Sequence, residues 1–82
     1  MVEVIFEERF KHLFSKIKDS ATREKIVKQI SKIKENPEVG KPMRFSRKGT
    51  RELYIPPFRL SYIYDYANQI AYIIDIYHKD EQ

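Results

Sequence analysis

The chain contains no cysteine and no tryptophan, and it has only two histidines among its 82 residues. The absence of cysteine excludes disulfide bonds and thiolate metal sites, and it is typical of a reducing, cytoplasmic setting. His12 and His78 lie far apart in the sequence, so the spacing of a metal-binding motif is missing. We therefore expect no metal and no small-molecule cofactor.

Long apolar runs are also missing. No segment approaches the roughly 18 consecutive apolar residues of a membrane-spanning helix, so we expect no membrane association. Residues 1–9 lack a basic start followed by an apolar segment, and we expect no signal peptide. Eleven isoleucines, six tyrosines and five phenylalanines are enough for one hydrophobic core, which predicts a single domain over residues 1–82.

Positive charge is concentrated in one part of the chain. The formal net charge is +4, which is consistent with an acidic partner: nucleic acid, an acidic protein or an anionic membrane surface. A composition rich in lysine explains positive charge in general, but it does not explain the clustering between Met43 and Tyr66. The basic residues of this stretch are Arg44, Arg47, Lys48, Arg51 and Arg59. We expect them to face a polyanion.

Hydrophobic periodicity predicts a short strand and two helices in the first half of the chain. Alternating apolar residues over Val2–Phe6 predict the strand. Apolar residues three and four positions apart between residues 6 and 17 predict an amphipathic helix. Ser20 is expected to cap a second helix over Ala21–Glu35, which ends before Pro37.

The second helix should present one apolar stripe to the rest of the protein. We expect it to bury Ile26, Val27, Ile30 and Ile33, and to expose Arg23 with its lysines and glutamates. Because each helix of such a hairpin offers a single apolar stripe, the hairpin is expected to cover one face of a sheet.

The second half of the chain predicts three antiparallel strands. Their expected limits are Thr50–Ile55, Phe58–Tyr66 and Gln69–His78, with a turn at Ala67-Asn68. The passage over residues 38–49 is expected to be loop, with extended structure around residues 42–45. The predicted fold class is α+β: an N-terminal strand, an α-helical hairpin and a three-strand antiparallel meander, with both helices packed on one face of a small sheet.

Alternation divides the residues of the last two strands between two faces. In the strand that begins at Phe58, one face carries Leu60, Tyr62, Tyr64 and Tyr66, and the other carries Arg59, Ser61, Ile63 and Asp65. In the last strand, Ile70, Tyr72, Ile74, Ile76 and His78 share a face. We expect the more apolar set of each strand to lie under the helices, which leaves Arg59 on the open face.

Two short motifs in these strands resemble a known family. The segment Phe58-Arg59-Leu60-Ser61-Tyr62 is similar to the Y-R-[LIV]-x-Y segment of RelE/ParE toxins, and Ile76-Tyr77-His78-Lys79 is similar to their closing [IV]-x-H-R segment. The order of strand, helical hairpin, basic connection and aromatic strand also agrees with that family over nearly the whole chain. The chain therefore resembles the RelE/ParE toxins of type II toxin–antitoxin systems.

The resemblance implies a ribosome-dependent mRNA endoribonuclease, or mRNA interferase, that inhibits translation. In such metal-independent cleavage the ribose 2′-hydroxyl attacks the adjacent phosphate and the 5′-oxygen leaves, so a base, an acid and a cation are needed. Arg59 suits the cation, because a guanidinium is permanently charged and can bind two phosphate oxygens. His78 is the expected acid or base, since histidine ordinarily titrates near neutrality. Arg51 and Lys79 are expected to assist.

Further residues are expected to contact RNA rather than to react. They are Arg44, Arg47, Lys48, Tyr54 and Tyr77. The chain departs from the family on the strand over Thr50–Ile55, where RNA-cleaving members usually carry basic residues and this chain has Glu52 and Tyr54 beside Arg51.

Two other functions remain open alternatives. A ParE-like toxin would bind DNA gyrase and poison it without cutting RNA, and a chain with a decayed catalytic face would serve as an RNA- or protein-binding module. Every version implies a cognate antitoxin with an acidic, partly disordered segment, placed across the basic face or along the helical hairpin. The ribosome and mRNA are further expected partners of the endoribonuclease.

Overall fold

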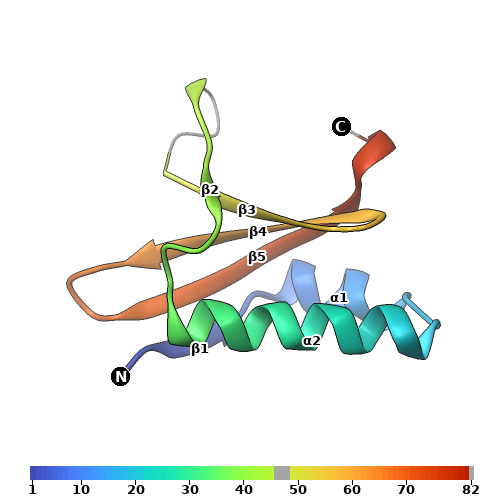
Figure 1. Cartoon of the computed structure of the whole chain (residues 1–82), viewed down its shortest axis with the longest axis horizontal. Coiled ribbons are helices and arrows are strands. Elements are labelled where there is room, and N and C mark those ends of the chain that lie inside the picture. The colour runs from blue at the N-terminus through green and yellow to red at the C-terminus, as the bar shows by residue number, and fades with distance from the viewer. Residues whose placement is uncertain (46–48, 82) are drawn as a thin grey trace.

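The protein is an α+β structure in which two helices cover one face of a five-stranded sheet (Figure 1). The computed structural model describes residues 1–45 and 49–81. Its elements are β1 (Glu3–Phe6), α1 (Glu8–Ser15), α2 (Ser20–Glu35), β2 (Lys41–Pro42), β3 (Arg51–Ile55), β4 (Phe58–Asp65), β5 (Ile70–His78) and the 3-10 helix η2 (Lys79–Glu81). The predicted fold class, helical hairpin and antiparallel meander are confirmed.

The sheet contains more strands than the meander alone. Its order is β1-β5-β4-β3-β2, with β1 parallel to β5 and every other pair antiparallel. Strand β2 has only two residues and pairs with β3 at one edge, at the start of the stretch for which we expected extended structure. Among the described residues, no helix is long and apolar enough to cross a membrane.

The turn between the helices is organised by Asp19 and Arg23. The Asp19 carboxylate accepts hydrogen bonds from the backbone N–H and the hydroxyl of Thr22, which lower the pKa of Asp19. Asp19 is therefore the N-cap of α2, and the prediction that Ser20 caps this helix is wrong. Asp19 takes the role because a cap side chain bonds the amide three positions ahead, and Thr22 is in that position.

Arg23 is tied to the end of α1, although it was expected to face water. Its guanidinium donates hydrogen bonds to the carbonyl oxygens of Phe14, at 3.1 Å, and Ile17, at 2.7 Å. Its Cζ atom also lies 4.2 Å from the centroid of the Phe14 ring. The last carbonyls of a helix lack partners within the helix, and Arg23 supplies them from the next helix.

The helix α2 buries a narrower stripe than its periodicity predicts. Ile26 and Ile33 are fully buried and Ile30 is half-buried, as expected. Val27, however, is 54% exposed. The helix therefore meets the sheet along one edge of its apolar stripe, and the other edge remains at the surface.

A β-bulge changes which residues of β5 face the helices. Tyr62 pairs with Ile73, but its neighbour Ser61 pairs with Asp75, so Ile74 is an extra residue in β5. Ala71 and Ile73 face the core before the bulge, and Ile76 faces it afterwards. The predicted face from Ile70 to His78 is therefore wrong, because an uninterrupted period of two cannot include a bulge. The buried apolar residues are Phe10, Ile26, Ile33, Ile55, Leu60, Tyr62, Ala71, Ile73 and Ile76.

The alternation predicted for β4 is confirmed at its centre. Leu60 and Tyr62 are fully buried in the core. Tyr66 is exposed, because β4 ends at Asp65 and Tyr66 lies in the following turn. The Tyr62 hydroxyl donates to the carbonyl of Pro37 at 2.7 Å and accepts from the amide of Gly40 at 2.8 Å. This side chain fastens the α2–β2 connection to the centre of the sheet, and its burial raises the pKa of Tyr62.

We expect the substitution Tyr62→Phe to lower the free energy of unfolding by about 1–3 kcal/mol, because the buried amide of Gly40 and the partly buried carbonyl of Pro37 lose their bonds to the hydroxyl. The half-buried Tyr72 on β5 is the matched control, and Tyr72→Phe should change the stability by less than about 0.5 kcal/mol. Urea unfolding followed by circular dichroism measures both. Equal effects of the two substitutions would contradict the role assigned to the Tyr62 hydroxyl.

Candidate functional site

The face of the sheet away from the helices carries a row of polar and aromatic side chains across β3, β4 and β5. Arg59 is the Cα partner of Tyr54 on β3 and of Tyr77 on β5. Ser61, two residues along the same strand, is the partner of Glu52. Residues two apart on a strand share a face, so this register gathers the five side chains on the open face opposite Leu60 and Tyr62.

Glu52 is the centre of this group and is only 5% exposed. Its Oε2 atom accepts hydrogen bonds from the Ser61 hydroxyl at 2.9 Å and from the Tyr77 hydroxyl at 2.7 Å. Its Oε1 atom lies 3.8 Å from a guanidinium nitrogen of Arg59. Burying a carboxylate is costly unless it is paired and hydrogen-bonded. The two hydrogen bonds and the Arg59 guanidinium offset part of this cost, and the carboxylate holds Arg59 and Tyr77 beside it in return.

Arg59 and Lys79 place two positive charges beside one exposed phenol. Tyr54 is 52% exposed, and its ring centroid lies 5.6 Å from Cζ of Arg59 and 5.7 Å from Nζ of Lys79. Lys79 opens η2, which rises from the sheet on the side away from the helices (Figure 1). This arrangement can bind an anion such as a phosphate, with an aromatic surface next to it.

His78 does not join this group. It is the Cα partner of Phe58, and the two rings lie 5.8 Å apart in an edge-to-face arrangement. Its Nδ1 atom accepts a hydrogen bond from the backbone N–H of Asp80. Because His78 follows Tyr77 directly, it points to the opposite face of the sheet from Arg59. The expected pairing of Arg59 with His78 at one site is therefore corrected.

Arg51 also lies apart from Arg59. It is the Cα partner of Tyr62, so its side chain starts on the helix side of the sheet. One of its guanidinium nitrogens donates to the carbonyl oxygens of Glu38, at 3.0 Å, and Gly40, at 2.7 Å, and the other lies 3.7 Å from the Glu38 carboxylate. Arg51 thus holds the α2–β2 connection in place, and it is not at the site where we expected it.

The remaining predicted residues fall into three groups. Tyr54, Tyr77 and Lys79 lie on the open face with Arg59, as described above. Arg44 is exposed in the connection between β2 and β3, and Arg47 and Lys48 lie outside the described residues. Across residues 1–45 and 49–81, no three His, Asp or Glu side chains are grouped so that they could hold a metal ion.

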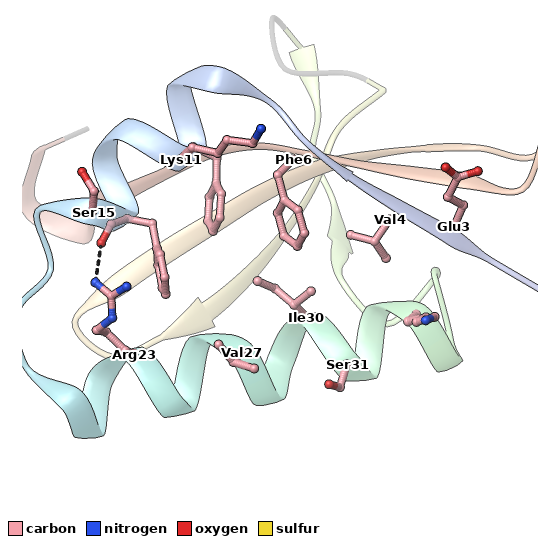
Figure 2. A pocket seen from close by; sticks show the side chains of 12 residues that line it. Glu3, Val4, Phe6, Lys11, Ser15, Arg23, Val27, Ile30 and Ser31 are labelled. Carbon is pink, nitrogen blue, oxygen red and sulfur yellow. Dashed lines mark hydrogen bonds between the residues drawn. The ribbon is translucent and has the colours of Figure 1, made fainter.

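A second surface feature is an apolar groove between β1–α1 and α2 (Figure 2). Its volume is about 670 Å³. Phe6, Phe10 and Phe14 form one wall, with successive ring centroids 5.6 and 5.5 Å apart. Val27 and Ile30 of α2 form the opposite wall. The groove lies on the helix side of the sheet, so it is separate from the face that carries Arg59.

Charged side chains border this groove. Lys11, Arg23 and Lys34 are positive, and Glu3 is negative. The exposed edge of the α2 stripe at Val27 belongs to the same groove, which explains why that apolar residue does not enter the core. An apolar channel with a mainly basic border fits an amphipathic segment with acidic residues along its sides.

A family model for the ParE toxin of type II toxin–antitoxin systems, parDE, matches residues 4–82 of this chain. The chain belongs to the RelE/ParE toxin family. No curated protein matches it. The fold and the family together make it a toxin of a type II toxin–antitoxin system.

Solved structures of toxins share this fold. The RelBE2 toxin–antitoxin complex of Mycobacterium tuberculosis contains a chain with 22% identity and a TM-score of 0.84, over 95% of this toxin and 98% of that chain. The YoeB/ParE toxin of Agrobacterium tumefaciens has 18% identity and a TM-score of 0.82, over 94% of this toxin and 98% of that chain. The intact RelBE toxin–antitoxin complex of E. coli contains a chain with 18% identity and a TM-score of 0.79, over 93% of this toxin and 94% of that chain.

Sequence reasoning missed Glu52 and Ser61 as members of the site. Glu52 was read only as a departure from the basic residues of related toxins, and Ser61 only as one residue of the open face. The signal that identifies them is the register between β3 and β4, which pairs Glu52 with Ser61. That register follows from the tight Pro56-Pro57 turn between the two strands.

We expect Arg51 to contribute to the stability of the toxin rather than to its chemistry. Arg51→Ala removes hydrogen bonds from a charged donor to two backbone carbonyls, so it should lower the free energy of unfolding by about 1.5–3 kcal/mol. Arg44→Ala, at an exposed position, should change it by less than about 0.5 kcal/mol. Chemical denaturation of the unmodified toxin, Arg51→Ala and Arg44→Ala tests this prediction. An unchanged midpoint for Arg51→Ala would contradict the structural role.

Proposed function

We propose that this toxin cleaves mRNA on the open face of the sheet, and that Arg59 binds the phosphate that reacts. The observation that supports the proposal is the group around Arg59: a second cation, Lys79, two phenols, Tyr54 and Tyr77, and a buried carboxylate, Glu52. A cation, an acid and a proton acceptor are the groups that metal-independent RNA cleavage needs. On the other face, His78 packs against Phe58 and Arg51 bonds the carbonyls of Glu38 and Gly40, so the two are not brought together.

The proposed reaction begins at the ribose 2′-hydroxyl. Its oxygen attacks the adjacent phosphorus, the bond from phosphorus to the 5′-oxygen breaks, and a cyclic phosphate forms. Tyr77 accepts the 2′ proton while it passes its own proton to Glu52 Oε2, 2.7 Å away. The phenol therefore remains neutral throughout, which avoids the poor basicity of an ordinary tyrosine at neutral pH. Tyr54 protonates the leaving 5′-oxygen, and Arg59 and Lys79 stabilise the charge on the phosphate oxygens.

The proposed substrate is mRNA that is being translated on the ribosome, in the cytoplasm. The open face carries groups that bind and cut a phosphate, but a small sheet face offers little surface for holding a long RNA in one position. The ribosome holds the message in a fixed frame, so it would supply the positioning that the toxin lacks. Inhibition of translation follows from loss of the message.

Expression of the toxin followed by primer extension should show cuts in translated messages at fixed positions within codons. Arg59→Gln should reduce the cleavage rate by about 100-fold or more, because it removes the charge that stabilises the transition state. His78→Ala is the matched control on the other face of the same strand pair, and it should retain most of the activity. Circular dichroism of both variants checks that they fold.

The result that contradicts this proposal is growth arrest with intact messages. The match to the ParE toxin model favours DNA gyrase as the second candidate target, as the family resemblance implies. A supercoiling assay with purified gyrase distinguishes the two functions. If neither gyrase nor mRNA is affected, the chain is a binding module without catalytic activity.

We further propose that the cognate antitoxin inserts an acidic amphipathic segment into the groove between β1–α1 and α2. Two of the similar structures are toxin–antitoxin complexes by their names, RelBE and RelBE2. Three stacked phenylalanines form one wall of the groove, and its border carries Lys11, Arg23 and Lys34 against Glu3. Apolar anchors of the antitoxin would pack between the two apolar walls, while its acidic side chains would meet the basic border.

Val27→Asp should weaken antitoxin binding by about 30-fold or more, because it puts a charge on the apolar α2 wall of the groove. Val27 is already exposed, so this substitution should not affect the core. Val39→Asp is the control, since Val39 is 39% exposed and is not a lining residue of the groove; it should change binding less than threefold. Isothermal titration with the cognate antitoxin measures both. Equal losses for the two variants would contradict the groove as the binding surface, and a loss only for Arg59→Gln would place the antitoxin on the open face.

A further inference from the structure

Phe45 is the most exposed aromatic side chain that the structure describes. It lies in the connection between β2 and β3, and 91% of its surface is accessible. Its backbone φ is +59°, in the left-handed region that residues with a Cβ atom adopt at a cost. Among residues 1–45 and 49–81, no packing contact of the ring offsets the cost of this backbone conformation. A strained residue with an exposed aromatic ring indicates a contact outside the protein.

The position of Phe45 relates it to the open face rather than to the groove. Strand β2 pairs with Arg51 and Glu52 of β3 at the sheet edge, and it extends to the side of the sheet away from the helices (Figure 1). This is the side that carries Tyr54, Arg59 and Lys79. Phe45 follows β2 by three residues, so an RNA strand that runs from Arg59 along β3 towards Arg51 would approach the connection that carries Phe45.

The surroundings of Phe45 favour nucleic acid over protein as its partner. Its neighbour Arg44 is exposed, and Lys41 on β2 is exposed as well. A single ring among cations differs from the core of a protein interface, where apolar residues cluster and lysine is depleted. Aromatic rings next to positive charges are the usual surface for single-stranded nucleic acid, since bases stack on the ring and phosphates bind the cations.

We propose that Phe45 stacks on an unpaired base of the RNA that Arg59 binds. This inference rests on the proposed function and extends it from the reacting phosphate to another nucleotide of the same strand. Stacking on a ring has little dependence on base identity. Phe45 therefore contributes affinity and position, and the cut is not directed to a particular base by this contact.

The experiment measures the binding of a fluorescein-labelled single-stranded RNA by fluorescence anisotropy over a range of salt concentrations. Phe45→Ala should weaken binding about tenfold and leave the dependence on salt unchanged, because a neutral contact is lost. Phe45→Trp should retain binding. Phe45→Leu should behave like alanine, since leucine keeps the apolar character but has no ring.

Arg59→Gln separates this inference from the proposed function. It should weaken binding and reduce the slope of log K against log salt by about 0.7, the value expected for one lost phosphate contact with a single strand. If Arg59→Gln weakens binding and Phe45→Ala does not, the stacking proposal is wrong and the proposed function stands. If Arg59→Gln changes neither binding nor cleavage, the proposed function itself fails.

Two other results would also overturn the stacking proposal. Full binding by Phe45→Leu would show that any apolar side chain suffices, so the contact would be packing rather than stacking. Normal RNA binding by Phe45→Ala together with weaker binding of the antitoxin or of gyrase would show that the ring contacts a protein. Because Phe45 is almost fully exposed, all three substitutions should leave the circular dichroism spectrum unchanged.

Discussion

The register of β4 with its two neighbours is the constraint on which the rest of this structure depends. Leu60 and Tyr62 enter the core only if Arg59 and Ser61 point the other way. The same register that builds the core therefore assembles the open face, by pairing Arg59 with Tyr54 and Tyr77. A shift of β4 by one residue would disrupt the core and the open face together. The stability of the fold and the geometry of the site therefore depend on the same register.

Strand β3 shows how neighbouring residues acquire opposite roles. Arg51 reaches back to Glu38 and Gly40 on the helix side, whereas Glu52 lies on the open face among Ser61, Tyr77 and Arg59. The buried carboxylate lowers the positive charge of the site, but it fixes the groups around it. A rigid site with fewer charges depends more on positioning than on electrostatic attraction, which is consistent with a substrate held by a larger assembly.

The two helices and the strands β1, β3, β4 and β5 could be predicted from the sequence, because their apolar residues follow the helical and strand periods. Strand β2 and the helix η2 are too short to show such a period. The faces of β4 followed from alternation for the same reason. The bulge at Ile74 could not be predicted, since isoleucines at positions 73, 74 and 76 allow an unbroken alternation with Ile74 and Ile76 on one face. The positions of His78 and Arg51 depend on pairing register, and the contacts of Arg23 depend on where α1 ends. These positions and contacts are set by tertiary structure, whereas composition and residue spacing predict only local structure.

The two proposed surfaces lie on opposite sides of the sheet, which limits how an antitoxin can act. A segment confined to the groove would contact Phe6, Phe10 and Val27 without touching Arg59. Such an antitoxin would prevent cleavage only through its bulk, by excluding the toxin from the place where mRNA is held. To cover Arg59 directly, the antitoxin chain must continue from the groove around one edge of the sheet. The edge strand β1 borders the groove, whereas the other edge strand, β2, lies at the far side of the sheet. The shorter path from the groove to the open face therefore passes over β1.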